Sequence, residues 1–168
     1  MASDTLEQPR VIEIDKRRFS SEEYRKLLKA GNVSELFYFN AYRLWGEVVH
    51  GNHIGNTIGF PTINQKYEQG QLVPKFGVYS TFSYIGNKMY LSVTNVGVKP
   101  TIAGERFPLA ETHIIDFEGD LYGKEIEVKF FDFIRAERKF DSIETLKNQI
   151  EEDLKTAINQ YDELSLIY

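Results

Sequence analysis

The 168 residues suffice for one domain with a buried core, and a composition of 42% hydrophobic and 27% charged residues is typical of a globular protein. The net charge of -5 argues against a nucleic-acid partner, because binding to phosphates depends on clustered lysines and arginines. The absence of cysteine excludes disulfides, zinc thiolate sites and thiol nucleophiles. No apolar run approaches the ~20 residues that cross a bilayer, so we expect a cytoplasmic protein with no membrane partner.

Two short helices are predicted in the N-terminal segment 1–41. Ser20 and Glu23 match a capping box, in which each side chain bonds the backbone of the other residue, and Gly31 is a typical stop signal. A second helix is expected over residues 33–39, where apolar residues cluster. The segment 1–41 is therefore interpreted as an extension that precedes the main domain.

The main domain, residues 42–168, is dominated by segments rich in β-branched and aromatic residues, which are typical of strands. Gly86 and Asn87 tolerate positive φ and predict a tight hairpin. Because no helix of 10–15 residues separates these segments, an antiparallel barrel or sandwich is expected rather than a parallel sheet. The expected strands cover residues 44–50, 77–85, 88–96, 110–117 and 125–133.

A helix is predicted at the C-terminal end of the chain. Asp141 and Glu144 are interpreted as its capping pattern. Apolar residues then recur at helical spacing, which predicts that one face of the helix lies on the strands. These residues are Ile143, Leu146, Ile150, Leu154 and Ala157.

A glycine-rich segment follows the first expected strand, with Gly51, Gly55 and Gly59 within nine residues. Glycines let backbone N–H groups approach phosphate oxygens closely, so the segment is a candidate phosphate site. Its spacing matches neither the P-loop nor the dinucleotide fingerprint, and a plain turn explains it equally well.

The next residues suggest a metal site. Pro61 restricts Phe60 to extended conformations, and continued extension points Thr62 and Asn64 the same way. A hydroxyl and a carboxamide oxygen both suit a hard cation such as Mg²⁺, which usually keeps waters and phosphates as its other ligands. An edge strand with two solvated polar side chains is the alternative.

Further candidate residues lie at strand ends. Glu111, a carboxylate early in a strand, is a candidate general base, and His113 on the same face is a second, although a lone histidine in a strand is more often structural. Asn95 begins a turn that is either a pocket wall or only a turn. Arg135 and Phe140 precede the last helix and are candidates to bracket an aromatic ligand, unless they belong to a simple charged loop.

Taken in order, these segments closely resemble riboflavin kinase, especially the kinase module of bacterial bifunctional riboflavin kinase/FAD synthetases. The resemblance covers residues 44 to 157 and implies a mainly β fold, a six-stranded antiparallel Greek-key barrel with a C-terminal helix. It also implies transfer of the γ-phosphoryl group of ATP to the 5′-hydroxyl of riboflavin, giving FMN and ADP. The matching motifs are GEVVHG, GNTIGFPTIN, FGVY, NVGVKPT, ETHIIDFEGDLYG and RKFDS.

The resemblance also assigns roles to residues. Thr62 and Asn64 would bind Mg²⁺, or another divalent metal, together with the ATP phosphates, and Glu111 would deprotonate the riboflavin hydroxyl. The segment 51–59 would cradle the phosphates. The loop 135–140 and the start of the last helix would cover the flavin. A monomer is expected. The residues expected to contact ligands are Gly51, Gly55, Asn56, Thr57, Gly59, Pro61, Thr62, Asn64, Asn95, Arg135 and Phe140.

Three departures from the family pattern leave alternatives open. Asn56 stands where the phosphate loop commonly carries a basic residue, which favours a catalytically weakened flavin- or nucleotide-binding module. Ile63 replaces a small residue, interpreted as a packing change on the opposite face. Residues 20–31 resemble the tail of an adenylyltransferase module. The histidine-containing motif of that module is absent from these 168 residues, so FAD synthesis is not expected from this chain. The alternative is that the chain is the kinase part of a larger bifunctional enzyme. A flavin-dependent oxidoreductase and a purely structural barrel are the remaining alternatives.

Overall fold

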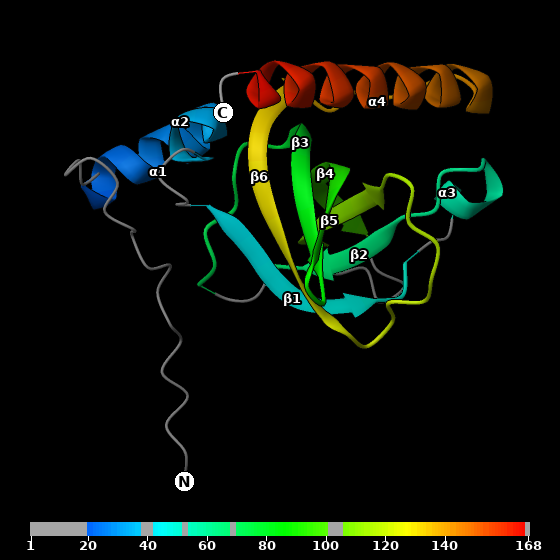
Figure 1. The fold of residues 1–168 in the computed structure, drawn as a ribbon, viewed down its shortest axis with the longest axis horizontal. Helices are drawn as coiled ribbons and strands as arrows, with labels where there is room; N and C mark the ends of the chain where they lie inside the picture. The colour runs from blue at the N-terminus through cyan, green and yellow to red at the C-terminus, as the bar shows by residue number, and fades with distance from the viewer. Residues whose placement is uncertain (1–19, 38–41, 52–53, 68–69, 101–105, 167–168) are drawn as a thin grey trace, which may run out of the picture.

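The computed structural model describes residues 20–37, 42–51, 54–67, 70–100 and 106–166 (Figure 1). Within this part of the chain no helix is both long enough and apolar enough to span a membrane. The elements in chain order are α1 (Ser21–Ala30), α2 (Val33–Phe37), β1 (Arg43–Val49), α3 (Ile54–Thr57), β2 (Ile63–Lys66), β3 (Gly77–Ile85), β4 (Lys88–Pro100), β5 (Arg106–Ile114), β6 (Glu125–Arg135) and α4 (Ile143–Ser165).

The six strands form a closed barrel in the order β1-β2-β5-β4-β3-β6, and all neighbouring pairs are antiparallel. Strands β3, β4 and β5 follow one another, and β6 returns to lie beside β3, which is the Greek-key order. The predicted mainly β, six-stranded antiparallel barrel with a C-terminal helix is therefore confirmed.

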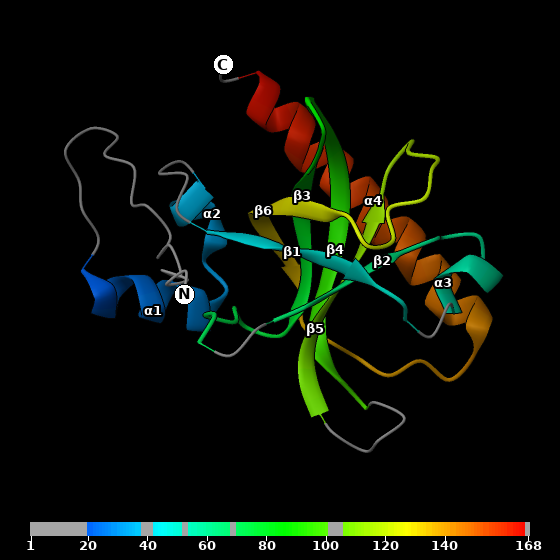
Figure 2. The same ribbon diagram turned by 90° about the horizontal axis from the view of Figure 1, so that it is seen from below.

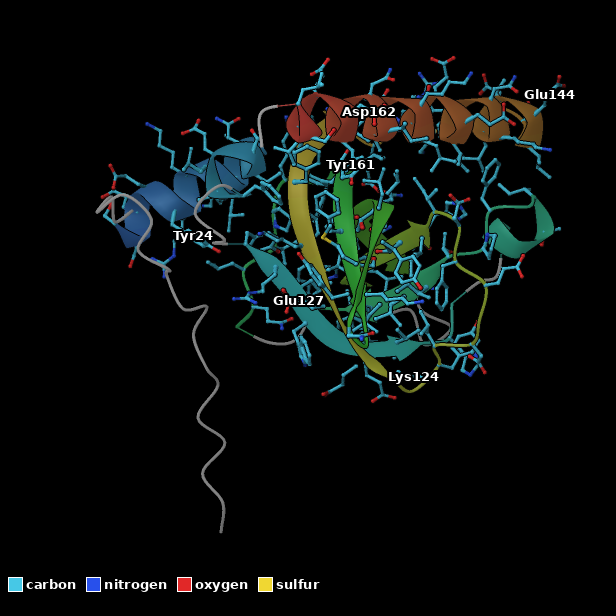
Figure 3. All side chains as sticks on the ribbon, viewed as in Figure 1. Tyr24, Lys124, Glu127, Glu144, Tyr161 and Asp162 are labelled. Atoms are coloured by element: carbon cyan, nitrogen blue, oxygen red, sulfur yellow. The ribbon has the colours of Figure 1, made fainter. Side chains whose placement is uncertain are left out.

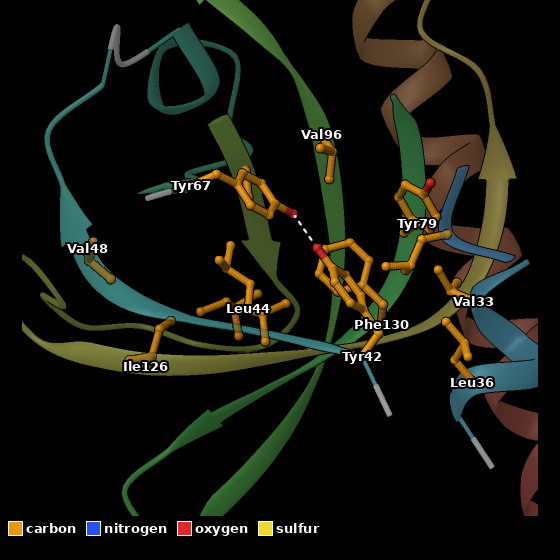
Figure 4. Close-up of a cluster of buried hydrophobic side chains, with 14 of the residues drawn as sticks. Val33, Leu36, Tyr42, Leu44, Val48, Tyr67, Tyr79, Val96, Ile126 and Phe130 are labelled. Atoms are coloured by element: carbon orange, nitrogen blue, oxygen red, sulfur yellow. Dashed lines mark hydrogen bonds between the residues drawn. The ribbon is translucent and has the colours of Figure 1, made fainter. Parts of the chain in front are cut away.

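The barrel interior holds the main hydrophobic core. On β6, Ile126, Val128 and Phe130 alternate inward, as the period of a strand requires, and are 3%, 0% and 0% exposed. Tyr42 and Tyr67 bring phenol groups into this core (Figure 4), where the Tyr42 hydroxyl donates to the Leu72 carbonyl oxygen at 2.8 Å. Burial raises the pKa of both phenols, so these groups stay neutral and act through hydrogen bonds.

A second set of inward side chains is polar. We call the hydroxyls of Thr81, Ser83, Ser92, Thr94 and Thr112 the hydroxyl row. All five residues are 0% exposed, and successive oxygens along the row are 2.8–2.9 Å apart. A hydroxyl can donate and accept at once, so the row satisfies itself while tying β3, β4 and β5 together. The row thereby keeps β3, β4 and β5 in register, and the outward side chains of the same strands form the outer face of the sheet.

The N-terminal helices cover one end of the barrel (Figures 1 and 2). The capping box of α1 is present as predicted, with the Glu23 amide donating to Ser20 Oγ at 3.2 Å and the Ser20 amide to Glu23 Oε2 at 2.8 Å. Gly31 ends the helix in the left-handed conformation at φ 83°. Residues 1–19 and 38–41 lie outside the described residues, and the division at residue 41 stays a prediction.

Helix α4 lies across the outer face of the barrel, against β3, β4 and β6 (Figure 1). Tyr161 on its barrel-facing side (Figure 3) meets Phe82 edge-on, with ring centroids 5.9 Å apart. The predicted cap of Asp141 and Glu144 is wrong by one position: Ser142 is the N-cap, its hydroxyl accepting from the Thr145 amide at 3.1 Å. Thr145 replaces the expected glutamate because its hydroxyl also reaches the Ser142 backbone.

Several predicted bounds also change. Ile143 was expected to belong to the apolar stripe of α4, but it is 65% exposed, so the stripe starts later in the helix. Strand β2 is not an edge strand, since β1 and β5 flank it. Within the described residues the second helix ends at Phe37. Two strands are longer than predicted, since β4 continues to Pro100 instead of residue 96 and β6 to Arg135 instead of residue 133. Strand β5 ends at Ile114 instead of residue 117.

Candidate functional site

A pocket of about 380 Å³ lies between the outer face of the barrel and α4. Its walls come from β2, β4, β5, the ends of β3 and β6, the segment around α3, and the loop before α4. Both ribbon views place α3 beside the first turns of α4 (Figures 1 and 2), and Gly55 of α3 lines the pocket. Segments far apart in sequence therefore meet around one concavity, which is the usual form of a small-molecule site.

Cross-strand register explains which side chains enter the pocket. We call Asn64, Glu111, Asn95, Val78 and Arg135 the pocket row, because each is the register partner of the next on β2, β5, β4, β3 and β6. Directly opposite residues on neighbouring strands have Cβ atoms ~4.5–5.5 Å apart and share a face. All five line the pocket. Thr62 and His113 line it as well, two residues along from Asn64 and Glu111.

The predicted metal pair and the predicted base thus face the same space. Thr62 and Asn64 both line the pocket, as the extended segment after Pro61 requires. Glu111 stands between two carboxamides, with Asn64 on one side and Asn95 on the other. Ile63 points the opposite way and packs against the barrel core, as expected for a packing change.

Asn64 carries a buried acceptor into the pocket wall. It is 4% exposed, and its Oδ1 atom has no hydrogen-bond partner within the described residues. A buried acceptor without a partner costs ~1–3 kcal/mol, which makes Asn64 a candidate to bind a ligand. Gly51 packs against this amide, because a Cβ on Gly51 would stand 2.3 Å from Asn64 Nδ2.

The residues present fit a hard cation such as Mg²⁺. The unpartnered carbonyl oxygen of Asn64 and the hydroxyl of Thr62 are neutral oxygen donors on one wall, with the Glu111 carboxylate adjacent. Among the described residues no group of three His, Cys, Asp or Glu side chains could hold a metal. A cation here would therefore depend on these neutral oxygens and on ligands that a substrate brings.

The glycine-rich segment differs in part from the expected loop. Residues 54–57 form the single-turn helix α3, and the Phe60 amide closes it by donating to the Gly55 carbonyl oxygen at 2.8 Å. A Cβ on Gly55 would stand 2.3 Å from Phe60 O and 3.3 Å from Thr62 Oγ1. Gly55 thus permits the close approach that brings this segment to Thr62.

Not every expected ligand residue lies in the pocket wall. Gly55 is part of the lining, and Gly51 contacts it through Asn64. Thr57, Gly59 and Pro61 are exposed and do not line the pocket, so their contact with a ligand stays a prediction. The side chain of Asn56 lies outside the described residues.

Arg135 and Phe140 both line the pocket, and the Arg135 guanidinium lies 5.6 Å from the Phe140 ring centroid. That they bracket an aromatic ligand stays a prediction. Arg135 also donates to the buried Asp153 of α4, with Nε–Oδ1 at 2.9 Å and Nη2–Oδ2 at 2.8 Å. Gln149 Nε2 also donates to Asp153 Oδ1, at 2.9 Å.

The start of the last helix was expected to cover the flavin, but sequence reasoning did not foresee how far along α4 the pocket extends. Leu146, Ile150 and Leu154 line it, and the spacing of these residues had predicted packing on the strands. The position of Asp153 in the sequence could have indicated this. It is a charged residue on the apolar stripe, beside Leu154 and about one helical turn from Ile150. A carboxylate at such a position needs a buried partner, and Arg135 is that partner.

Comparison with known proteins agrees with this arrangement. The family model of riboflavin kinase (Flavokinase) matches residues 39–161. The bifunctional riboflavin kinase/FMN adenylyltransferases of Bacillus subtilis (strain 168) and Escherichia coli (strain K12) are 36% and 40% identical over 152 and 143 residues, which is 88% and 83% of this chain. These stretches are 48% and 45% of the relatives, so the chain spans about half of their length.

Two solved structures show the same fold. The crystal structure of a macrolide-efflux protein from Streptococcus pneumoniae superposes with a TM-score of 0.76 at 35% identity, over 88% of this chain and 49% of that one. A riboflavin kinase from Trypanosoma brucei gives a TM-score of 0.50 at 19% identity, over 71% of this chain and 79% of that one. The resemblance drawn from the motifs is confirmed by the family match and the curated relatives, and the chain belongs to the riboflavin kinase family.

Proposed function

We propose that this chain transfers the γ-phosphoryl group of ATP to the 5′-hydroxyl of riboflavin, giving FMN and ADP. The observation that carries the proposal is the pocket row, in which the Glu111 carboxylate is the direct cross-strand neighbour of Asn64, whose buried amide oxygen has no partner in the described part of the chain. A base and a cation site side by side are what transfer to an alcohol requires. The family match and the curated relatives support the same activity.

In the proposed step, the Glu111 carboxylate accepts the proton of the riboflavin 5′-hydroxyl. The ribityl oxygen then bonds to the γ-phosphorus in line with the breaking bond to the β–γ bridging oxygen, and ADP leaves. A divalent cation, Mg²⁺ in our proposal, would be held by Thr62 and Asn64 and would neutralise phosphate charge when bound. The protein mainly aligns the two substrates, which by itself accounts for much of the rate.

The remaining wall residues divide the pocket between the two substrates. The segment around Gly55 approaches Thr62, so we place the ATP phosphates there. Asn95 lies on the other side of Glu111 and has a buried, unpartnered Oδ1 atom, so we assign it to a neighbouring ribityl hydroxyl. The apolar side chains of α4 would then contact the flavin ring.

Incubation of the chain with riboflavin, ATP and Mg²⁺, followed by chromatography, tests the proposal. FMN and ADP should appear in equal amounts, and a chelator should abolish both. Riboflavin that binds without forming FMN would instead support the weakened binding module that Asn56 favours. We also predict that this chain corresponds to the kinase half of the bifunctional relatives. We further predict a cytoplasmic location, a monomeric state and no nucleic-acid partner.

A further inference from the structure

His113 makes a contact that restricts its chemistry. Its Nδ1 atom lies 2.8 Å from the carbonyl oxygen of Pro61. A carbonyl oxygen can only accept, so the hydrogen of this bond belongs to Nδ1. The bond therefore selects the Nδ1–H form of the ring.

The contact involves a residue that lies outside the hydrogen-bonded ladder of the sheet. The ladder between β2 and β5 starts at the pair Ile63 and Thr112, so Pro61 and Thr62 precede it. Proline has no N–H to donate, and the chain at Pro61 can be tied to β5 only through its carbonyl. The His113 side chain supplies that tie from β5 itself.

His113 also contacts the residue that joins the glycine-rich segment to this point. The Phe60 ring lies edge-on to the imidazole, with centroids 5.7 Å apart and an interplanar angle of 82°. The Phe60 amide in turn donates to Gly55 O, and Gly55 is in close contact with Thr62. One side chain thereby fixes the junction between the proposed phosphate segment and the proposed metal pair.

We propose that His113 is a positioning residue for the metal–nucleotide half of the site, acting through its Nδ1–H bond to Pro61, and that it is not the base. This inference rests on the proposed function. It predicts that loss of the bond weakens the use of Mg²⁺ and ATP, while riboflavin binding is unchanged.

Three variants separate the donor from the ring. His113→Asn places an amide nitrogen near the position of Nδ1, His113→Gln places one near Nε2, and His113→Phe keeps the ring against Phe60 without a donor. We expect the Phe and Gln variants to raise the KM for Mg²⁺-ATP about 5- to 10-fold, the usual effect of losing one hydrogen bond. The Asn variant should stay within about 2-fold of the unmodified chain, because the donor is restored.

Two further readouts accompany the kinetics. Riboflavin affinity, measured by quenching of flavin fluorescence, should be the same in all variants, and the pH profile of turnover should keep its shape. Hydrogen exchange at the amides of Phe60 and Thr62 should speed up in the Phe and Gln variants and not in the Asn variant. This last measurement needs no turnover and reports the tie to Pro61 directly.

Each outcome decides a different claim. A Phe variant with an unchanged KM for Mg²⁺-ATP, beside an unmodified chain that makes FMN, overturns the positioning role alone. Equal losses of kcat in all three variants, with loss of one limb of the pH profile, would make His113 a proton carrier instead. An unmodified chain that makes no FMN overturns the proposed function, and the positioning role with it.

Discussion

The two faces of the β3–β4–β5 sheet differ in the partners of their central polar groups. On the inner face, the hydroxyls of Thr81, Ser92, Thr94 and Thr112 bond one another at 2.8 Å. On the outer face, the buried carboxamide oxygen of Asn95 has no partner among the described residues, and the same holds for Asn64 on the adjoining β2. Inside the barrel Gln65 Oε1 is likewise unpartnered, although its Nε2 donates to two carbonyl oxygens. The hydroxyl row therefore stabilises the fold, whereas Asn64 and Asn95 offer acceptors that we propose a ligand uses. Gln65 on the inner face and Ser80 on the outer face, which bonds Gln160, depart from this division.

The largest effect should come from Glu111→Gln on the outer face. The amide cannot accept a proton, so FMN formation should fall at least about 100-fold, within the ~10²–10⁴ that a general base contributes. Riboflavin binding should persist, as checked by fluorescence quenching. Glu118→Gln, at an exposed position, is the control and should leave turnover unchanged. Near-normal turnover in the Glu111 variant would rule that residue out as the base.

Gly51→Ala should be the next most damaging change. The new methyl group would stand 2.3 Å from Asn64 Nδ2 and must displace that amide, so turnover should drop by up to about 100-fold, the effect of a 1 Å misplacement. Titration of Mg²⁺ should show the loss. The matched control is Gly46→Ala on β1, the strand that precedes Gly51, because a Cβ at Gly46 would meet nothing closer than 3.9 Å. Equal activity of the two variants would remove Asn64 from the metal site.

On the inner face, Thr94→Val should lower stability without a direct effect on chemistry. Thr94 bonds both Thr81 and Thr112, and its loss leaves buried hydroxyls short of a partner at a cost of ~1–3 kcal/mol. Denaturant unfolding measures the change in the free energy of unfolding. Thr94→Ser keeps the hydroxyl and should cost less. A Val variant as stable as the unmodified chain would contradict the structural role of the hydroxyl row.

The smallest effect on stability, with the opposite sign, should come from Asn95→Leu one residue further on. Removing an unpartnered acceptor should leave the unliganded chain as stable as before or more stable by up to about 1 kcal/mol. Riboflavin affinity should fall about 5- to 10-fold for the lost hydrogen bond, whereas a flavin ring without the ribityl chain should bind equally well. A parallel loss for both ligands would show that Asn95 acts on the ring or on the fold.

Local signals were sufficient for part of this fold. The capping box at Ser20 and the stop at Gly31 defined α1, because both ends of that helix are set by neighbouring residues. The residues 77–85 were identified as a strand with the bounds that β3 has. The cap of α4 was missed by one residue, since Asp141 and Ser142 are both good N-caps and only the backbone conformation selects between them.

By itself, the sequence indicated five of the six strands, the helices α1, α2 and α4, the family, and the residue types that a phosphoryl-transfer site needs, because these depend on short-range periodicity and ordered motifs. It did not predict α3, and it did not identify β2 among its strands. Only the tertiary structure decided which side chains meet. Asn64, Glu111 and Asn95 become neighbours through the register of β2, β5 and β4, which depends on barrel closure and not on any local pattern. In the same way only the tertiary structure shows that Arg135 pairs with Asp153, because α4 carries a buried carboxylate that must be neutralised.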